Sequence, residues 1–363
     1  MSLVPKHIKN LSPYKPGKTI ESVKKQYNLD RIIKLASNEN PIGPSLKSIS
    51  AAVDVLDNSH RYPDASGLDL REKLADQFNL RTDNVILGSG SEGIMSSIMR
   101  TFLRENDELI SAENSFIGFR VLANASGKKV NWIPKKEYKY DLVSIVNAIN
   151  QNTKIIYIAN PDNPTGTYIN KDEFDNFMLK VPERVLVILD EAYFEYAQNT
   201  IDYPDSMVYR YDNVITLRTF SKVHGLAGFR VGYGFAHHEL IQNLMKVKLP
   251  FEPSSVSQEA AIAALDDLEH LDKTIKLNQS EMNLMISNFN EIKIDFIPSV
   301  GNFITIVFES RDYVINLVQY LLENGIIVRD LIGFGLPHCI RISIGTKEEN
   351  KIFINKVKEY LSK

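Results

Sequence analysis

Residues 154–166 have the sequence KIIYIANPDNPTG, and residues 184–193 have the sequence RVLVILDEAY. The first part of each stretch, IIYIA and VLVIL, is apolar at consecutive positions instead of alternate ones. A strand of this composition is covered on both faces, which is typical of a parallel sheet lying between helices. We therefore predict an α/β fold with a mostly parallel central sheet covered by helices.

Similar apolar runs and helical periodicities continue on both sides of these two stretches. Strands are predicted at 84–87, 108–111, 213–217 and 230–236, and helices at 67–79 and 91–104. After residue 253 the order changes. Two helical runs at 256–265 and 268–289 are followed by short strand candidates and by helices at 312–323 and 347–361.

The chain is long enough for two hydrophobic cores, because 363 residues exceed the size at which a single core usually stops growing. We predict a large domain over residues 41–265 and a smaller α+β domain over residues 266–363. Residues 1–40 are polar and interrupted by three prolines. They are expected to form an arm with little regular structure that packs with the small domain.

Charge and composition argue against several kinds of partner. The chain has 42 basic and 45 acidic residues, so no basic surplus favours nucleic acid. No segment approaches the roughly 20 apolar residues that cross a bilayer, and the N-terminus lacks the apolar core of a signal peptide. The single cysteine, Cys339, fits a reducing compartment. We expect a cytoplasmic protein with small-molecule substrates, no membrane or nucleic-acid partner, and no metal site.

Polar segments directly follow four of the predicted strands. In open parallel sheets, ligands bind at the carboxyl ends of the strands, so these segments should converge. Taken singly, each could be a turn, a helix cap or a surface lysine, but those interpretations do not explain why all four lie at strand ends. The segments are Gly88-Ser-Gly-Ser-Glu92, Asn160-Pro-Asp-Asn-Pro-Thr-Gly166, Asp190-Glu-Ala-Tyr193 and Arg218-Thr-Phe-Ser-Lys222.

Pyridoxal 5'-phosphate is one ligand that would account for all four segments. It needs an amine that forms a Schiff base with its aldehyde, and Lys222 can supply that amine. Its ring nitrogen stays protonated beside a buried carboxylate, and Asp190 fits this role. Asn163 and Tyr193 can donate hydrogen bonds to its phenolic oxygen.

The phosphate group suits the start of the helix that follows Gly90 and Ser91, because free backbone N–H groups and the helix dipole favour an anion there. Thr219, Ser221 and Arg230 would complete this phosphate site.

The segment from Ser221 to Arg230, SKVHGLAGFR, resembles the S-K-x-x-G-L-A-G-x-R signature of fold-type I aminotransferases, which depend on pyridoxal phosphate. NPDNPTG and DEAY resemble two further signatures of that family, and the order and spacing match from about Ser12 to Ile344. The resemblance implies the fold-type I transferase architecture. It also implies that Lys222, Asp190 and Tyr193 are catalytic.

Within this group the chain is most similar to the histidinol-phosphate aminotransferase family. The resemblance implies transfer of an amino group between L-histidinol phosphate and 2-oxoglutarate in histidine biosynthesis, giving imidazole-acetol phosphate and L-glutamate. The segments that carry it are LSPYKPG at 11–17, SNENP at 37–41, RYPD at 61–64, GNF at 301–303, GIIVR at 325–329 and IRISIG at 340–345.

The same resemblance implies a homodimer with shared active sites, in which Tyr62 reaches the phosphate of the cofactor in the neighbouring subunit. It implies that Arg329 and Arg341 bind the anionic end of the substrate, and that Tyr14 and Asn40 line the pocket.

Three positions depart from the family pattern. Phe116 stands where a ring that stacks on the cofactor is expected, often tyrosine, and stacking needs only the ring. GSGSEG replaces a more usual G-N-G-S-D-E, which leaves the side-chain contacts of Ser91 and Glu92 open. Asp162 replaces a frequent asparagine and is expected to be harmless in a turn.

Other functions fit the same residues. Because Arg341 could bind a carboxylate as well as a phosphate, the chain could be an aromatic amino acid aminotransferase or a threonine-phosphate-type decarboxylase on the same fold. It could also be a non-catalytic module that binds pyridoxal phosphate, for example the ligand-sensing domain of a regulator.

Overall fold

The computed structural model describes residues 3–13, 16–207 and 211–362. Within these residues, seven strands form the central sheet in the order β2-β8-β7-β6-β5-β3-β4. All neighbouring pairs are parallel except the two that contain β8. The α/β fold class is confirmed. The strands are β2 (Val85–Gly88), β3 (Glu108–Ala112), β4 (Lys129–Ile133), β5 (Thr153–Ala159), β6 (Leu186–Asp190), β7 (Val214–Thr219) and β8 (Gly232–Phe235).

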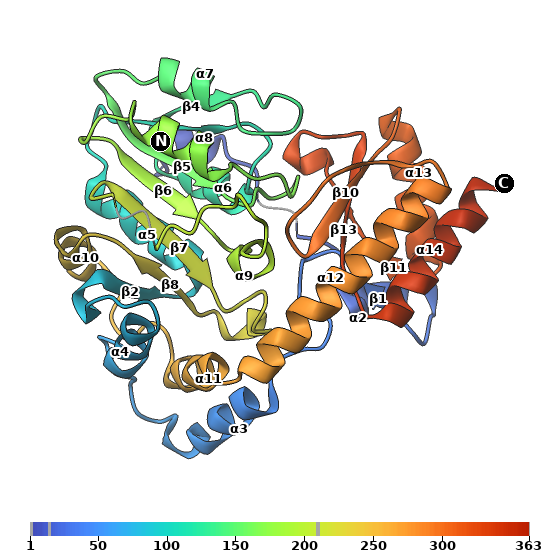
Figure 1. Cartoon of the computed structure of the whole chain (residues 1–363), viewed down its shortest axis with the longest axis horizontal. Helices are drawn as coiled ribbons and strands as arrows, with labels where there is room; N and C mark the ends of the chain where they lie inside the picture. The colour runs from blue at the N-terminus through green and yellow to red at the C-terminus, as the bar shows by residue number, and fades with distance from the viewer. Residues whose placement is uncertain (1–2, 14–15, 208–210, 363) are drawn as a thin grey trace.

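Helices cover both faces of this sheet, as Figure 1 shows. Ile155 and Tyr157 of β5 share one apolar cluster with residues of α5, whereas Ile156 and Ile158 share another with residues of α8. The predicted burial of this strand on both faces is therefore confirmed. The helices of this part are α3 (Leu46–Asp54), α4 (Leu68–Gln77), α5 (Gly90–Phe102), α6 (Ile117–Ala125), α7 (Leu142–Asn147), α8 (Lys171–Met178), α9 (Phe194–Ala197), α10 (His238–Met245) and α11 (Ser255–Leu265).

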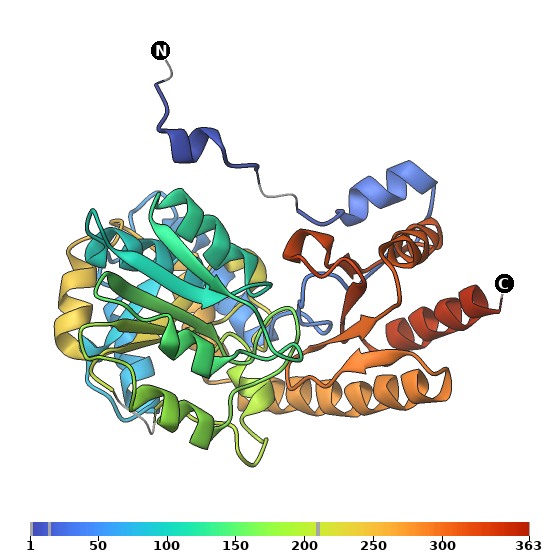
Figure 2. The same ribbon diagram turned by 90° about the horizontal axis from the view of Figure 1, so that it is seen from above.

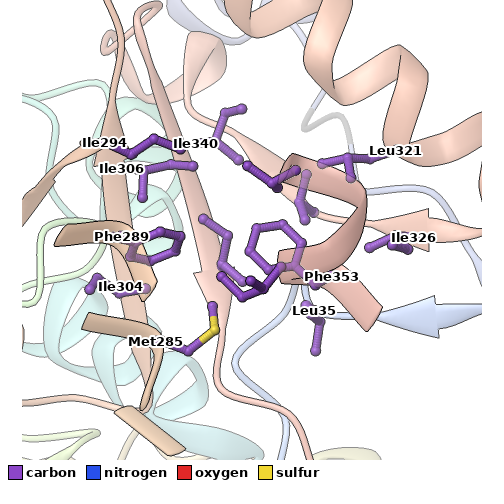
Figure 3. Close-up of a cluster of buried hydrophobic side chains, with 14 of the residues drawn as sticks. Leu35, Met285, Phe289, Ile294, Ile304, Ile306, Leu321, Ile326, Ile340 and Phe353 are labelled. Carbon is purple, nitrogen blue, oxygen red and sulfur yellow. The ribbon is translucent and has the colours of Figure 1, made fainter. Parts of the chain in front are cut away.

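A second, antiparallel sheet has the strand order β12-β13-β10-β9. The long helix α12 leads to it from α11 (Figure 1). Phe289, Ile304, Ile340 and Phe353 belong to the apolar cluster between this sheet and its helices (Figure 3). The elements are α12 (Leu268–Glu291), β9 (Asp295–Ile297), β10 (Phe303–Val307), α13 (Arg311–Glu323), β11 (Ile326–Ile327), β12 (Arg329–Asp330), β13 (Cys339–Ser343) and α14 (Lys347–Leu361). Among the helices placed by the structure, none combines the length and the apolar content that crossing a bilayer requires.

The N-terminal segment contains more regular structure than predicted. α1 (Lys6–Lys9) packs near α6, and α2 (Ile20–Tyr27) lies next to α13 (Figure 2). α2 starts at a capping box, in which Thr19 and Ser22 each accept a hydrogen bond from the other's backbone N–H at 3.1 Å. β1 (Ile33–Lys34) pairs in parallel with β11. The expectation of little regular structure is wrong here, because the proline signals do not extend past residue 17.

The packing of the consecutive helices α11 and α12 supports a domain boundary between them. α11 contacts α3 and α4, whereas α12 contacts α14 and β9. We propose that the large domain ends at residue 265 and that the small domain covers residues 266–363. Residues 1–40 would be attached to the small domain through β1.

Candidate active site

The polar segments meet at the side of the central sheet formed by the carboxyl ends of its parallel strands. β2, β5, β6 and β7 all end there, and β8 starts there because it runs in the opposite direction. A pocket lies at this side, and its lining includes every predicted cofactor-binding residue except Tyr62. The lining residues are Gly90, Ser91, Glu92, Phe116, Tyr157, Ala159, Pro161, Asn163, Asp190, Ala192, Tyr193, Thr219, Ser221, Lys222 and Arg230.

Asp190 is the last residue of β6 and is buried at the base of this pocket. Its Oδ2 accepts a hydrogen bond from the hydroxyl of Tyr157 at 2.8 Å, and its Oδ1 accepts one from the backbone N–H of Ala192 at 3.2 Å. Burial raises the pKa of this carboxyl group from 3.8 to about 6. A cation beside Asp190 would favour the ionised form and lower this pKa again.

Lys222 lines the same pocket, on the segment that follows β7. Burial, and after it the guanidinium group of Arg341, lower the pKa of its ammonium group from 10.5 to about 8. Its Nζ donates a hydrogen bond to the carbonyl of Ser37 at 3.3 Å. More of this amine is neutral near pH 7 than of an ordinary lysine, and the neutral form is the one that acts as nucleophile and base.

The hydroxyl of Tyr193 accepts hydrogen bonds from Nδ2 of Asn38 at 2.9 Å and from Nδ2 of Asn163 at 3.2 Å. Burial raises the pKa of Tyr193 to about 12, so the phenol keeps its proton. Because both asparagines donate to this oxygen, its own proton is available for an acceptor in the pocket.

The start of α5 is built to accept an anion. Ser89 makes no side-chain cap there, so the first backbone N–H groups of a 13-residue helix are left for another acceptor. Gly90 has a φ of 71°, and a Cβ on it would lie 2.7 Å from Nη2 of Arg230. A Cβ on Gly232 would lie 2.6 Å from the backbone nitrogen of Ser91. Glycine at both positions keeps this space open.

Side chains complete the anion site. Ser221 Oγ accepts hydrogen bonds from Thr219 Oγ1 at 3.0 Å and from Arg230 Nη1 at 3.4 Å. Glu92 forms an ion pair with Arg230 at 3.4 Å. Donors for a phosphate therefore lie at one end of the pocket, with an amine at Lys222 and an acid at Asp190. This donor set fits pyridoxal phosphate.

A second pocket adjoins the first and shares Phe116, Asn163, Tyr193 and Lys222 with it. Arg341 is buried in its wall, where its Nη1 donates to Oδ1 of Asn163 at 2.5 Å. The residues that line only the second pocket are Gly17, Ala36, Ser37, Asn38, Ile117, Arg329, Phe334 and Arg341.

Two predicted residues of the described part of the chain are not brought to these pockets. Asn40 lines neither of them, contrary to the prediction. Its Nδ2 donates to the carbonyl of Val223 at 2.8 Å, and its Oδ1 accepts from the N–H of Ile42 within its own turn. Tyr62 is 79% exposed and stacks on Phe251 at 4.3 Å, away from the pocket of its own chain. Tyr14 lies outside the described residues.

Two polar groups of the site were missed from the sequence. In the sequence, Tyr157 is indistinguishable from a core residue of the run IIYIA. Its ring does stack on Phe119 at 4.0 Å, but its hydroxyl donates a hydrogen bond to Asp190. A hydroxylated ring in an aliphatic strand was the available signal, because a buried tyrosine hydroxyl usually has a partner. Asn38 takes the place in the second pocket that was predicted for Asn40.

Residues 30–357 match the family model of aminotransferase class I and II. The chain therefore belongs to the class I and II aminotransferases. It is 41% identical to histidinol-phosphate aminotransferase 1 of Nitrosococcus oceani over 357 residues, which cover 98% of this chain and 95% of that protein. It is also 41% identical to the histidinol-phosphate aminotransferase of a Geobacillus species over 356 residues, covering 98% and 97% of the two chains. Within the wider family, it belongs to the histidinol-phosphate aminotransferases.

Solved structures agree with this assignment. The crystal structure of histidinol-phosphate aminotransferase from Sinorhizobium meliloti in complex with pyridoxal-5'-phosphate is 25% identical, with a TM-score of 0.88 over 99% of this chain and 97% of that one. Aspartate aminotransferase from Thermotoga maritima, 18% identical with a TM-score of 0.86 over 99% and 100% of the two chains, shares the fold. The predicted fold type and enzyme class are confirmed.

Proposed function

We propose that this chain moves an amino group between L-histidinol phosphate and 2-oxoglutarate in histidine biosynthesis, with pyridoxal phosphate as its cofactor. The observation that carries the proposal is the position of Lys222, which lies in the wall shared by the two pockets. The first pocket fits the cofactor, and the second presents Arg341 and Arg329 to an anion. Both substrates carry an anionic group, and the names of the chain's relatives support the choice of donor.

The side chains have distinct roles in this proposal. When bound, pyridoxal phosphate would supply an electron sink for the negative charge left on the substrate carbon that loses its proton. Lys222 would take up that proton on Nζ and deliver it again within the same pocket. Asp190 would hold a proton on the ring nitrogen, and Tyr193 would donate its hydroxyl proton to the phenolic oxygen. Phe116 would cover one face of the ring.

A substrate panel tests the proposed function directly. The purified protein with pyridoxal phosphate is mixed with one donor at a time, and the visible absorbance of the cofactor and the formation of L-glutamate from 2-oxoglutarate are followed. Histidinol phosphate should convert the cofactor within one turnover and give glutamate. Much faster turnover of phenylalanine would favour an aromatic aminotransferase instead, and release of carbon dioxide would favour a decarboxylase.

Replacing Arg341 with alanine should raise the KM for 2-oxoglutarate and for histidinol phosphate on the order of 100-fold, because a buried, hydrogen-bonded charge pair with the substrate is lost. Steady-state kinetics with each substrate varied in turn measure this change. The matched control is Arg311→Ala, at the start of α13 and outside both pockets. An unchanged KM for both substrates in the Arg341 variant would remove this residue from the anion site.

We further propose that the chain works in the cytoplasm as a homodimer. Exposed apolar side chains gather on α3 and on the segments next to it, and an apolar patch of this kind is typical of a protein interface. The segments are held together by the Tyr62–Phe251 stack, by an ion pair of Lys47 with Asp267 at 3.6 Å, and by a hydrogen bond from Lys248. The patch contains Leu46, Val53, Leu56, Tyr62, Leu68, Leu249, Phe251 and Leu268.

Tyr62 provides a test of shared active sites. If its hydroxyl reaches the cofactor phosphate of the partner subunit, Tyr62→Ala should lower activity, and so should Lys222→Ala. Unfolding and refolding the two variants together should restore about a quarter of the wild-type sites, because half of the dimers would be mixed and each would hold one intact site. The recovered activity of the mixture is compared with the sum of the separately treated variants. Equality of the two would exclude a contribution from the partner.

A further inference from the structure

Asp162, expected to be harmless in a turn, lies in a buried ion pair. Its carboxylate contacts Nζ of Lys135, which follows β4, and the two side chains are 0% and 5% exposed. Two charges that are removed from water persist only when they are well paired and hydrogen-bonded. Asp162 Oδ2 also accepts a hydrogen bond from Oγ1 of Thr165 at 2.6 Å.

The pair connects two loops that lie far apart in the sequence. Oδ1 of Asp162 accepts a hydrogen bond from Oγ of Ser115 at 2.7 Å, and Nζ of Lys135 donates to the carbonyl of Asn114 at 3.1 Å. These contacts join the loop before α6 to the NPDNPTG loop. None of the three side chains involved, Ser115, Lys135 and Asp162, lines the cofactor pocket.

Each of these loops presents the next residue to the cofactor pocket. Phe116 follows Ser115, and Asn163 follows Asp162. Asn163 in turn bonds Tyr193 through its Nδ2 and Arg341 through its Oδ1. A displacement of Asp162 would therefore change two things together. It would move the ring of Phe116, and it would change the hydrogen bonds that Asn163 and Tyr193 offer to the phenolic oxygen of the cofactor.

We propose that Lys135 and Asp162 form a positioning pair, which sets Phe116 and Asn163 relative to the bound cofactor. This inference rests on the proposed function, because it assumes that the pocket binds pyridoxal phosphate. An asparagine at position 162 has a single acceptor oxygen, so it could accept from Ser115 or from Thr165 but not from both as the carboxylate does. It would also leave the ammonium group of Lys135 buried without a carboxylate. The carboxylate at position 162 and the lysine at position 135 therefore depend on each other, because either charge alone would be buried without a partner of opposite sign.

The test uses the variants Lys135→Met, Asp162→Asn and the double variant, each as the holoenzyme. The visible absorption band of the bound cofactor is titrated with pH, because its apparent pKa reports the hydrogen bonds at the ring. Each single variant should shift this pKa by about half a unit or more and lower kcat/KM by roughly 10- to 100-fold. The double variant, which buries no unpaired charge, should recover most of both losses.

Lys129→Met is the matched control, since Lys129 lies at the other end of β4 and pairs with Glu108 at 2.9 Å, far from the pocket lining. If the Lys135 variant does not fold, Ser115→Ala removes the link to Asp162 while keeping both charges, and it should shift the band in the same manner. The proposal is overturned if the variants lose only thermal stability and keep the wild-type band pKa and kcat/KM. If the wild type binds the cofactor but fails to convert histidinol phosphate, only the proposed substrate fails, and the band titration still decides the role of the pair. A wild type without any cofactor band would overturn both.

Discussion

Replacing Lys222 with alanine should lower the rate of transamination by roughly 10,000-fold or more while the protein stays folded, because this one amine acts as both nucleophile and base. No other lysine lines the first or the second pocket in the part of the chain that the structure covers. Single-turnover absorbance with histidinol phosphate measures the rate, and circular dichroism checks the fold.

Two control experiments distinguish the loss of the Lys222 amine from a general loss of protein structure. Lys246→Ala, at the exposed residue that caps the C-terminal end of α10, should keep the wild-type rate. Adding a small primary amine such as methylamine to the Lys222 variant should restore part of the proton transfer. A Lys222→Ala protein that transaminates as fast as the wild type would disprove the assignment of this residue.

Replacing Asp190 with asparagine should lower kcat on the order of 1,000-fold, because a neutral amide does not hold a proton on the ring nitrogen of the cofactor. The affinity for the cofactor should fall as well, since one charge-assisted hydrogen bond is lost. Equilibrium binding of pyridoxal phosphate and single-turnover kinetics measure the two effects. Asp190→Glu retains the charge and serves as the comparison. Full activity in the asparagine variant would contradict the role given to this carboxylate.

The same variant should have a pH signature in the cofactor-free protein. The pKa of Asp190 rises from 3.8 to about 6 on folding, so its contribution to stability is complete below pH 3.8 and is lost as the pH rises through about 6. Asparagine does not titrate. The free energy of unfolding of the variant, minus that of the wild type, should therefore increase by about 2 kcal/mol between pH 4 and pH 7. Urea unfolding at several pH values measures this difference in free energy. A difference that stays constant with pH would show that burial does not raise the pKa of Asp190.

Apolar runs predicted most strands of the central sheet and its mostly parallel character, but not the reversed direction of β8. VGYGF and IIYIA are both short runs without charged residues, so nothing local reveals that β8 runs against its neighbours. β4 was missed because it lies at the edge of the sheet, where Lys129 and Asn131 interrupt the apolar pattern. An edge strand needs only one covered side, so its sequence resembles that of a loop.

The candidate site was predictable to the extent that its residues directly follow buried strands. Lys222, Asp190 and Asn163 are of this kind. Asn38 and Phe334 reach the second pocket from segments that are distant in the sequence, and only tertiary packing brings them there. The Lys135–Asp162 pair escaped for the same reason, because each of its members alone looks like an ordinary surface charge.

The reversal of β8 has a consequence for how the cofactor is held. β7 and β8 are neighbours, and the short excursion between them includes both Lys222 and Arg230. The two residues proposed to bind the aldehyde carbon and the phosphate of the cofactor therefore lie at the two ends of one backbone segment. A cofactor bound at both ends of this segment would reduce its local unfolding. The enzyme without its cofactor should therefore be cut by proteases between residues 222 and 230 far more readily than the enzyme with bound cofactor.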